Sequence, residues 1–269
     1  MRSAIMAGLV LLAALTCAPR ILAMPAPPGS IGPYRYGPYG CNLRWNNCLG
    51  DGGAINRNFT CDTNSGVETL VGSFVPAWDI NSATGIEIVM DLASAGTTMP
   101  AWWSFKNAGA CRIQSIATNF VLPATAVGCA DWSNGQAAGG IGSYNIGLRG
   151  ANTARVTLAI AVPLGAATDL VGRKEYFAVN LHINHSKTVG TGACGGCSTP
   201  VCIVLNRTKM TTPVLGHETY YVQGPSNLTD SDYATWQGGA GVSASGTTGC
   251  PAATPSVRST WGAVKSLYR

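Results

Sequence analysis

The sequence predicts an antiparallel β-sandwich that is stapled by disulfide bonds and ends in one short helix. Three observations support this class: 34 glycines and 15 prolines among 269 residues, several short segments of alternating apolar and polar side chains, and ten cysteines. Frequent turn-forming residues favour many short strands over a few long helices. A jelly roll is one form of sandwich that fits, and a β-barrel is the alternative, because strand count does not separate the two.

The composition favours a packed core and argues against nucleic-acid binding. Charged residues make up 11% of the chain, apolar residues 46%, and the formal net charge is +5. A disordered chain normally has fewer apolar and more charged residues. The few charges are scattered, whereas a nucleic-acid interface needs a basic face that neutralises several phosphates. We therefore expect a globular protein with no nucleic-acid partner.

Residues 1–23 have the pattern of a Sec-type signal peptide. Arg2 provides a basic start, an apolar run follows over residues 4–17, and Ala23 precedes the expected cleavage point. A lipoprotein signal would use Cys17, but it lacks the small residue that such a signal places directly before the cysteine. No later segment approaches the 18 apolar residues of a membrane helix. We expect a protein without a membrane span, secreted or at the cell surface.

The next segment, residues 24–40, reads as a linker. It contains five prolines, four glycines and three tyrosines, a composition typical of extended arms. No comparable segment divides residues 41–269, which we expect to form a single domain.

Period-2 alternation is clearest in residues 85–92. Ile86, Ile88, Met90 and Leu92 share one face there, and Glu87 lies on the other. The same test predicts strands in residues 69–75, 112–122, 154–162, 174–183, 201–205 and 218–223.

One helix is expected at the C-terminus. Thr260 can cap it, and Trp261, Val264 and Tyr268 then form an apolar stripe. Docking of this stripe onto the sandwich is favoured over a role as a sorting signal.

Nine cysteines remain after cleavage of the signal peptide, and export makes disulfides their default fate. Spacing suggests two local hairpin bridges and a third group that pairs within itself: Cys48 with Cys61, Cys111 with Cys129, and Cys194, Cys197, Cys202 and Cys250 among themselves. An odd number leaves one cysteine as a thiol or paired between chains, and Cys41 is the candidate. The spacing does not fit a zinc ribbon, which needs a second C-x-x-C.

Aromatic residues give the best hint of a binding site. Trp102 and Trp103 are adjacent, so on a strand one of them would point outward. An outward Trp103, together with Trp132, could stack on a sugar ring, although packing in the core is the simpler explanation.

Oxygen-bearing residues give a weaker hint of calcium. Asp62 and Asn64 stand at alternate positions near a glycine, as in a calcium loop, but the EF-hand length is missing. An Asx turn explains the segment with fewer assumptions.

No catalytic motif stands out. The chain lacks G-x-S-x-G and a P-loop, and His217-Glu218 lacks the second histidine of a zincin because Tyr221 occupies that position. His182 and His185 would lie on opposite faces of a regular strand. Distant carboxylates could still converge as in a glycosidase.

Four stretches, residues 70–76, 100–111, 187–206 and 260–269, resemble uncharacterised secreted, cysteine-containing β-proteins of environmental bacteria. The resemblance covers most of residues 41–269, implies a bacterial exported protein and carries no activity. The sequence therefore favours a non-catalytic exported module that binds a glycan or another surface protein or serves in structural assembly; a carbohydrate-active hydrolase on a jelly roll is the alternative.

Overall fold

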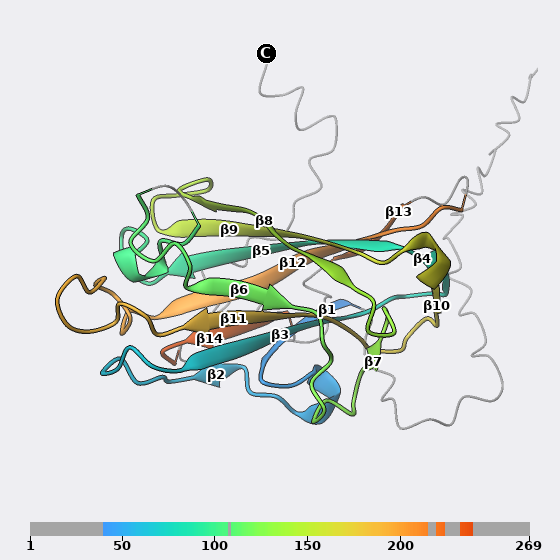
Figure 1. Cartoon of the computed structure of the whole chain (residues 1–269), viewed down its shortest axis with the longest axis horizontal. Coiled ribbons are helices and arrows are strands. Elements are labelled where there is room, and N and C mark those ends of the chain that lie inside the picture. Colours follow the sequence, from blue (N-terminus) through green and yellow to red (C-terminus); the bar gives the residue numbers. More distant parts are fainter. Residues whose placement is uncertain (1–39, 107–108, 215–218, 224–231, 239–269) are drawn as a thin grey trace, which may run out of the picture. The chain divides into compact units, whose positions relative to one another are not determined.

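Two β-sheets packed face to face make up most of the folded chain (Figure 1). The computed structural model describes residues 40–106, 109–214, 219–223 and 232–238. The strands are β1 (Gly40–Trp45), β2 (Asn56–Arg57), β3 (Val67–Val75), β4 (Ile80–Ala83), β5 (Gly85–Ser94), β6 (Ile116–Asn119), β7 (Ala130–Asp131), β8 (Ala138–Ile146), β9 (Thr153–Ala161), β10 (Thr168–Leu170), β11 (Tyr176–Asn184), β12 (Val201–Thr211), β13 (Thr219–Gln223) and β14 (Tyr233–Trp236). Three short 3-10 helices lie between them: η1 (Leu49–Asp51), η2 (Ala101–Trp103) and η3 (Leu164–Ala166).

The strand order explains how distant segments meet. One sheet has the order β1-β3-β11-β6, with β7 beside β11; the other has β2-β14-β12-β5-β9-β8, with β13 beside β12. A small third sheet pairs β4 with β10. Strand β3 pairs with β11 in one sheet, and β5 pairs with β12 in the other. The segment that contains β3 and β5 therefore lies beside the segment that contains β11 and β12 in both sheets. The predicted sandwich is confirmed.

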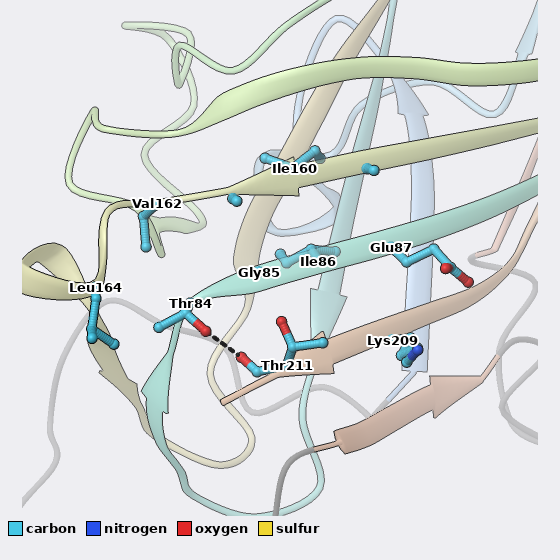
Figure 2. A pocket seen from close by; sticks show the side chains of 11 residues that line it. Thr84, Gly85, Ile86, Glu87, Ile160, Val162, Leu164, Lys209 and Thr211 are labelled. Atoms are coloured by element: carbon cyan, nitrogen blue, oxygen red, sulfur yellow. Dashed lines mark hydrogen bonds between the residues drawn. The ribbon is translucent and has the colours of Figure 1, made fainter. Parts of the chain in front are cut away.

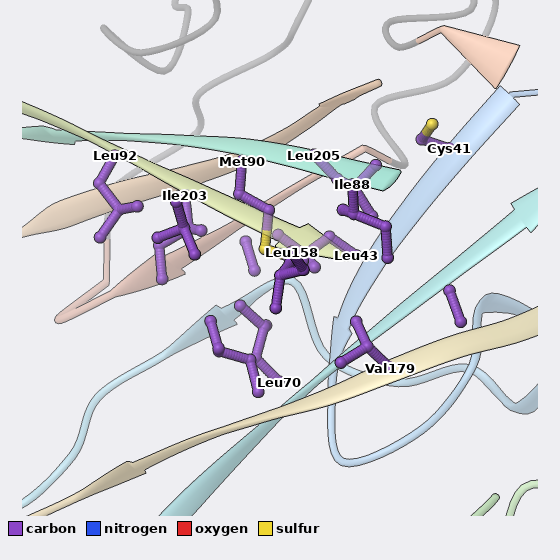
Figure 3. Close-up of a cluster of buried hydrophobic side chains, with 14 of the residues drawn as sticks. Cys41, Leu43, Leu70, Ile88, Met90, Leu92, Leu158, Val179, Ile203 and Leu205 are labelled. Atoms are coloured by element: carbon purple, nitrogen blue, oxygen red, sulfur yellow. The ribbon is translucent and has the colours of Figure 1, made fainter. Parts of the chain in front are cut away.

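The core lies between the two sheets and follows the alternation seen in the sequence. From the seven-stranded sheet, Met90 and Leu158 point inward and meet Leu70 and Val179 of the opposite sheet (Figure 3). All four are fully buried, and each such side chain stabilises the fold by about 1.5 to 3 kcal/mol. Gly72 leaves room for these side chains, because a Cβ there would lie 3.2 Å from Leu205 Cδ1 of the opposite sheet and 3.2 Å from Val179 Cγ1 of the neighbouring strand.

Each segment predicted by alternation contains a strand, with changed ends. The 112–122 segment shrinks to β6 because residues 111–114 form a turn around the buried Arg112 side chain. The 201–205 segment extends to Thr211 as β12. The longer strands β1 and β8 were not predicted, and neither were the short strands β2, β4, β7, β10 and β14. Strand β1 begins at the last residue of the expected linker, Gly40. The predicted C-terminal helix lies outside the described residues.

The predicted disulfide pairing is wrong for six cysteines, Cys48, Cys61, Cys111, Cys129, Cys194 and Cys197, and the predicted member Cys250 lies outside the described residues. The bonds join Cys48 to Cys129, Cys61 to Cys197, and Cys111 to Cys194. Cys202 is disulfide-bonded as well. The sequence separations are 81, 136 and 83 residues, so the bonds connect loops that the sheets bring together rather than the two arms of one hairpin.

Cys41 keeps its thiol, as expected for the odd cysteine. The sulfur lies 3.5 Å from Thr208 Oγ1 and donates to the carbonyl oxygen of Val222. Cys41 is 1% exposed, so the thiol is buried in the fold. Among the described residues, no helix has the length and apolar character needed to cross a membrane.

Candidate functional site

A hollow of about 490 Å³ lies on the outer face of the seven-stranded sheet, where β5 begins and β9 and β12 end (Figure 2). Residues of these strands and of the connections beside them line it: Thr84, Gly85, Ile86, Glu87, Ala159, Ile160, Ala161, Val162, Leu164, Lys209 and Thr211.

Small outward-facing residues create the hollow. Gly85 pairs with Ala161 on one side and with Thr211 on the other. Because β-strand side chains alternate, these positions face away from the core that Ile86 and Ile160 enter. A Cβ at Gly85 would lie 2.6 Å from Thr211 Oγ1, so glycine lets the Thr211 side chain lie against the strand.

The two ends of the hollow differ in chemistry. Leu164 of η3 is 70% exposed and forms an apolar wall together with Val162. Glu87 and Lys209 lie at the other end (Figure 2). A ligand with one apolar and one polar part would match this arrangement.

The charged end holds one carboxylate. Glu87 Oε1 accepts a hydrogen bond from Arg207 Nη2 at 2.8 Å, and both side chains are 38% exposed. Such an exposed pair contributes little to stability. Glycosidases use two carboxyl groups about 5 to 10 Å apart, whereas Glu87 is the single carboxylate among the residues that line the hollow. The lining of the hollow therefore offers one carboxyl group, where a glycosidase uses two.

The structure places both predicted tryptophans in the core. Trp103 and Trp132 are 0% and 1% exposed, so neither forms a surface platform for a sugar. The prediction of an outward side chain failed because residues 101–103 form the helix η2 instead of a strand. Trp102 and Trp103 therefore both turn inward, where their rings meet edge to face with centroids 5.2 Å apart.

The segment proposed for calcium has a structural role. Asn64 Oδ1 accepts the backbone N–H groups of Thr188 and Val189 at 2.7 and 3.0 Å. Asp62 is exposed. In the described ranges, acidic, cysteine and histidine side chains meet at ligand spacing in one group, which contains Asp51 and the disulfide partners Cys48 and Cys129. Disulfide sulfurs are not the thiolates that bind metals.

His182 lies in β11 and His185 follows directly after this strand, and the two side chains contact different residues. His182 Nδ1 lies 3.0 Å from Thr69 Oγ1, and desolvation lowers the pKa of His182. His185 is buried, with Nε2 3.2 Å from Glu68 Oε1. The structure does not bring the two rings to a common site.

Arg112 is a buried charge that holds loops together. It is 1% exposed and donates to the carbonyl oxygens of Trp102 at 2.8 Å, Ser186 at 2.9 Å, and Asn184. Its guanidinium carbon lies 3.5 Å from the centroid of the Trp102 ring, a cation–π contact. Desolvation lowers the pKa of Arg112 to about 9, so the side chain stays protonated at neutral pH.

Glu175 forms a second internal anchor. Its carboxyl oxygens accept the N–H groups of Leu49 and Gly50 at 3.0 and 2.9 Å and the Ser73 hydroxyl at 2.5 Å. Desolvation by burial raises the pKa of Glu175 above its ordinary value, although these hydrogen bonds act in the opposite direction. Both Arg112 and Glu175 are thus engaged in fixing the fold.

Sequence reasoning missed the residues of the hollow. Alternation identifies the apolar face of residues 85–92 but gives no information about the shape of the outward face. Glycine and alanine at outward positions of segments 85–92 and 154–162 were the signal for a hollow, but the sequence does not show that these two segments are neighbours in the sheet.

Comparisons with family models, curated proteins and solved structures find no match to the chain. They leave the resemblance to exported bacterial proteins untested. The site must therefore be judged on its own geometry.

Proposed function

We propose that the protein is an exported, non-catalytic binding or structural module that acts at the cell surface or outside the cell. One observation carries the proposal: the outer sheet face has an open hollow with an apolar wall, a polar end and a single carboxylate. Three long-range disulfides support an oxidising compartment. Secretion rests in addition on the pattern of residues 1–23, and bacterial origin rests on the sequence resemblance.

The hollow suits a glycan unit or a short segment of another surface protein. Its open, shallow form lets part of a longer molecule enter. Aliphatic contact with Leu164 and hydrogen bonding near Lys209 would fix the orientation of the ligand. A hydrolase would need a second carboxyl group near Glu87.

The test uses the mature, oxidised protein on a glycan array and on immobilised surface proteins. Ala159→Trp should block the hollow and abolish binding. Leu164→Ala should weaken binding, whereas Val127→Ala is the matched control because Val127 is 74% exposed and does not line the hollow. Binding that is unaffected by Ala159→Trp, or no binding at all, would contradict the proposed site.

A polysaccharide-hydrolysis screen tests the alternative. The proposal predicts no product from any polymer. Product release that disappears in a Glu87→Gln variant would overturn the non-catalytic assignment.

A further inference from the structure

Strand β8 forms an open edge of the seven-stranded sheet. It spans nine residues and lies at the end of the strand order, beside β9 (Figure 1). The outer side of an edge strand presents a row of unpaired N–H and C=O groups. Among the described residues, β9 is the strand paired with β8, and β8 also contacts β6 of the opposite sheet.

The other sheet edges are short or covered. All six residues of β1 are buried, and the strand packs against β12 and β14 of the opposite sheet. The edge strand β6 has four residues and β2 has two. Proteins also protect edges with charged residues or proline, and β8 contains neither. Its one protective device is a bulge between Ile141 and Ser143.

We propose that β8 is a self-association edge, on which two copies of this chain pair their β8 strands antiparallel and join their seven-stranded sheets. The neutrality of the strand favours a second copy as the partner. When a strand pairs with itself about a twofold axis, identical charges come close to each other and repel. With no charge between Ala138 and Ile146, this repulsion does not arise.

The shape of the edge permits the pairing. Eight of the nine β8 residues are exposed or partly exposed, so the described chain leaves most of this strand uncovered. An axis at Gly142 places Ala138 opposite Ile146 of the second copy, and both residues are exposed and apolar. Since each copy has one such long edge in its described residues, pairing closes at a dimer rather than growing into a fibre.

The expected dimer is weak. One strand pair buries less surface than a stable interface usually does. We therefore expect a monomer–dimer equilibrium that shifts with protein concentration over roughly the micromolar range.

Sedimentation velocity of the mature, oxidised protein over a concentration series tests the proposal. Gly142→Lys places a charge at the twofold axis, where the two copies of this residue face each other, and it should weaken dimerisation at least tenfold. A Cβ at Gly142 would lie 3.6 Å from the Thr157 carbonyl oxygen, an ordinary contact, so the fold tolerates the substitution. Gly195→Lys is the control, because Gly195 is exposed, a Cβ there would meet nothing within 4 Å, and the residue lies in the loop before β12. Mixing Gly142→Lys with Gly142→Glu should restore association.

Hydrogen exchange locates the contact, because amides of β8 should exchange more slowly in the dimer. The proposal is overturned if the wild-type chain is monomeric at all concentrations, whether or not another extended segment binds β8. It is also overturned if Gly142→Lys dimerises like the wild type, or if dimer formation leaves β8 exchange unchanged. These outcomes do not depend on ligand binding in the hollow.

Discussion

Replacing Arg112 by methionine should destabilise the protein strongly. Methionine keeps much of the side-chain volume but removes the donors to the buried carbonyl group of Trp102 and to the partly buried carbonyl groups of Asn184 and Ser186. Each buried acceptor left without a partner costs about 1 to 3 kcal/mol. Loss of the cation–π contact with Trp102 adds about 1 kcal/mol or more. We expect Arg112→Met to lower the free energy of unfolding by at least about 3 kcal/mol.

Urea unfolding with intact disulfides, followed by tryptophan fluorescence and far-ultraviolet circular dichroism, measures this change. Arg173→Met is the matched control, because Arg173 is exposed and its loss should change stability by less than about 0.5 kcal/mol. Arg112→Lys should fall between the two, since an ammonium group keeps the charge but not the planar fork of donors. A loss below about 1 kcal/mol in Arg112→Met would refute the assigned role.

Three further predictions concern stability. Because burial raises the pKa of Glu175, the native state binds the proton of this carboxyl group more tightly than the unfolded state does. The free energy of unfolding of the wild type, relative to Glu175→Gln, should therefore fall as the pH rises above 4.5. Urea titrations at several pH values measure this difference, and a difference independent of pH would contradict the prediction. Removing the Cys111–Cys194 bond by a double alanine substitution should lower the free energy of unfolding by about 2 to 4 kcal/mol, and an unchanged urea midpoint would contradict its role in closing a long loop. Leu158→Ala should cost about 2 to 5 kcal/mol because Leu158 is fully buried between the sheets; a cost below about 1 kcal/mol would show that the core there is loosely packed.

The sequence predicts strands well where one face is buried and the other is exposed. In β9 the inward residues from Ala154 to Ile160 are buried and the residues between them are partly or fully exposed. Strand β1 carries a readable alternation, since Cys41, Leu43 and Trp45 are apolar and Asn42 and Arg44 between them are polar. Its position directly after the expected linker concealed it, and the structure buries both of its faces, including Arg44, whose Nη1 donates to the Leu43 carbonyl oxygen.

Strand β8 escaped prediction for a different reason. Three of its nine residues, Gly139, Gly140 and Gly142, have no side chain that could show which face is apolar. Only glycine fits at position 139, since a Cβ there would lie 2.1 Å from the Ala159 carbonyl oxygen. Because three residues of β8 lack a side chain, the strand shows no alternation in the sequence and its backbone is more exposed in the structure.

The disulfides and the hollow depend on long-range contacts that spacing cannot reveal. Spacing pairs cysteines that are near in sequence, whereas Cys61 lies 136 residues from its partner Cys197. The hollow needs three strands side by side, and their order β12-β5-β9 is not sequential. Both features follow from the sheet topology, which local periodicity leaves open.

The two ends of the seven-stranded sheet differ in structure. Where β12 begins, the loop of residues 185–200 is held by Arg112, Asn64 and two of the disulfides. Where β12 ends, at Thr211, the hollow depends on small side chains of the strands themselves. The first end uses the buried charge of Arg112 to fix a loop, whereas Glu87 and Lys209 form the polar end of the hollow opposite the apolar wall of Leu164. A surface that combines an apolar wall with few polar groups fixes a ligand by shape and by a small number of hydrogen bonds, which is the mode of recognition expected of the proposed binding module.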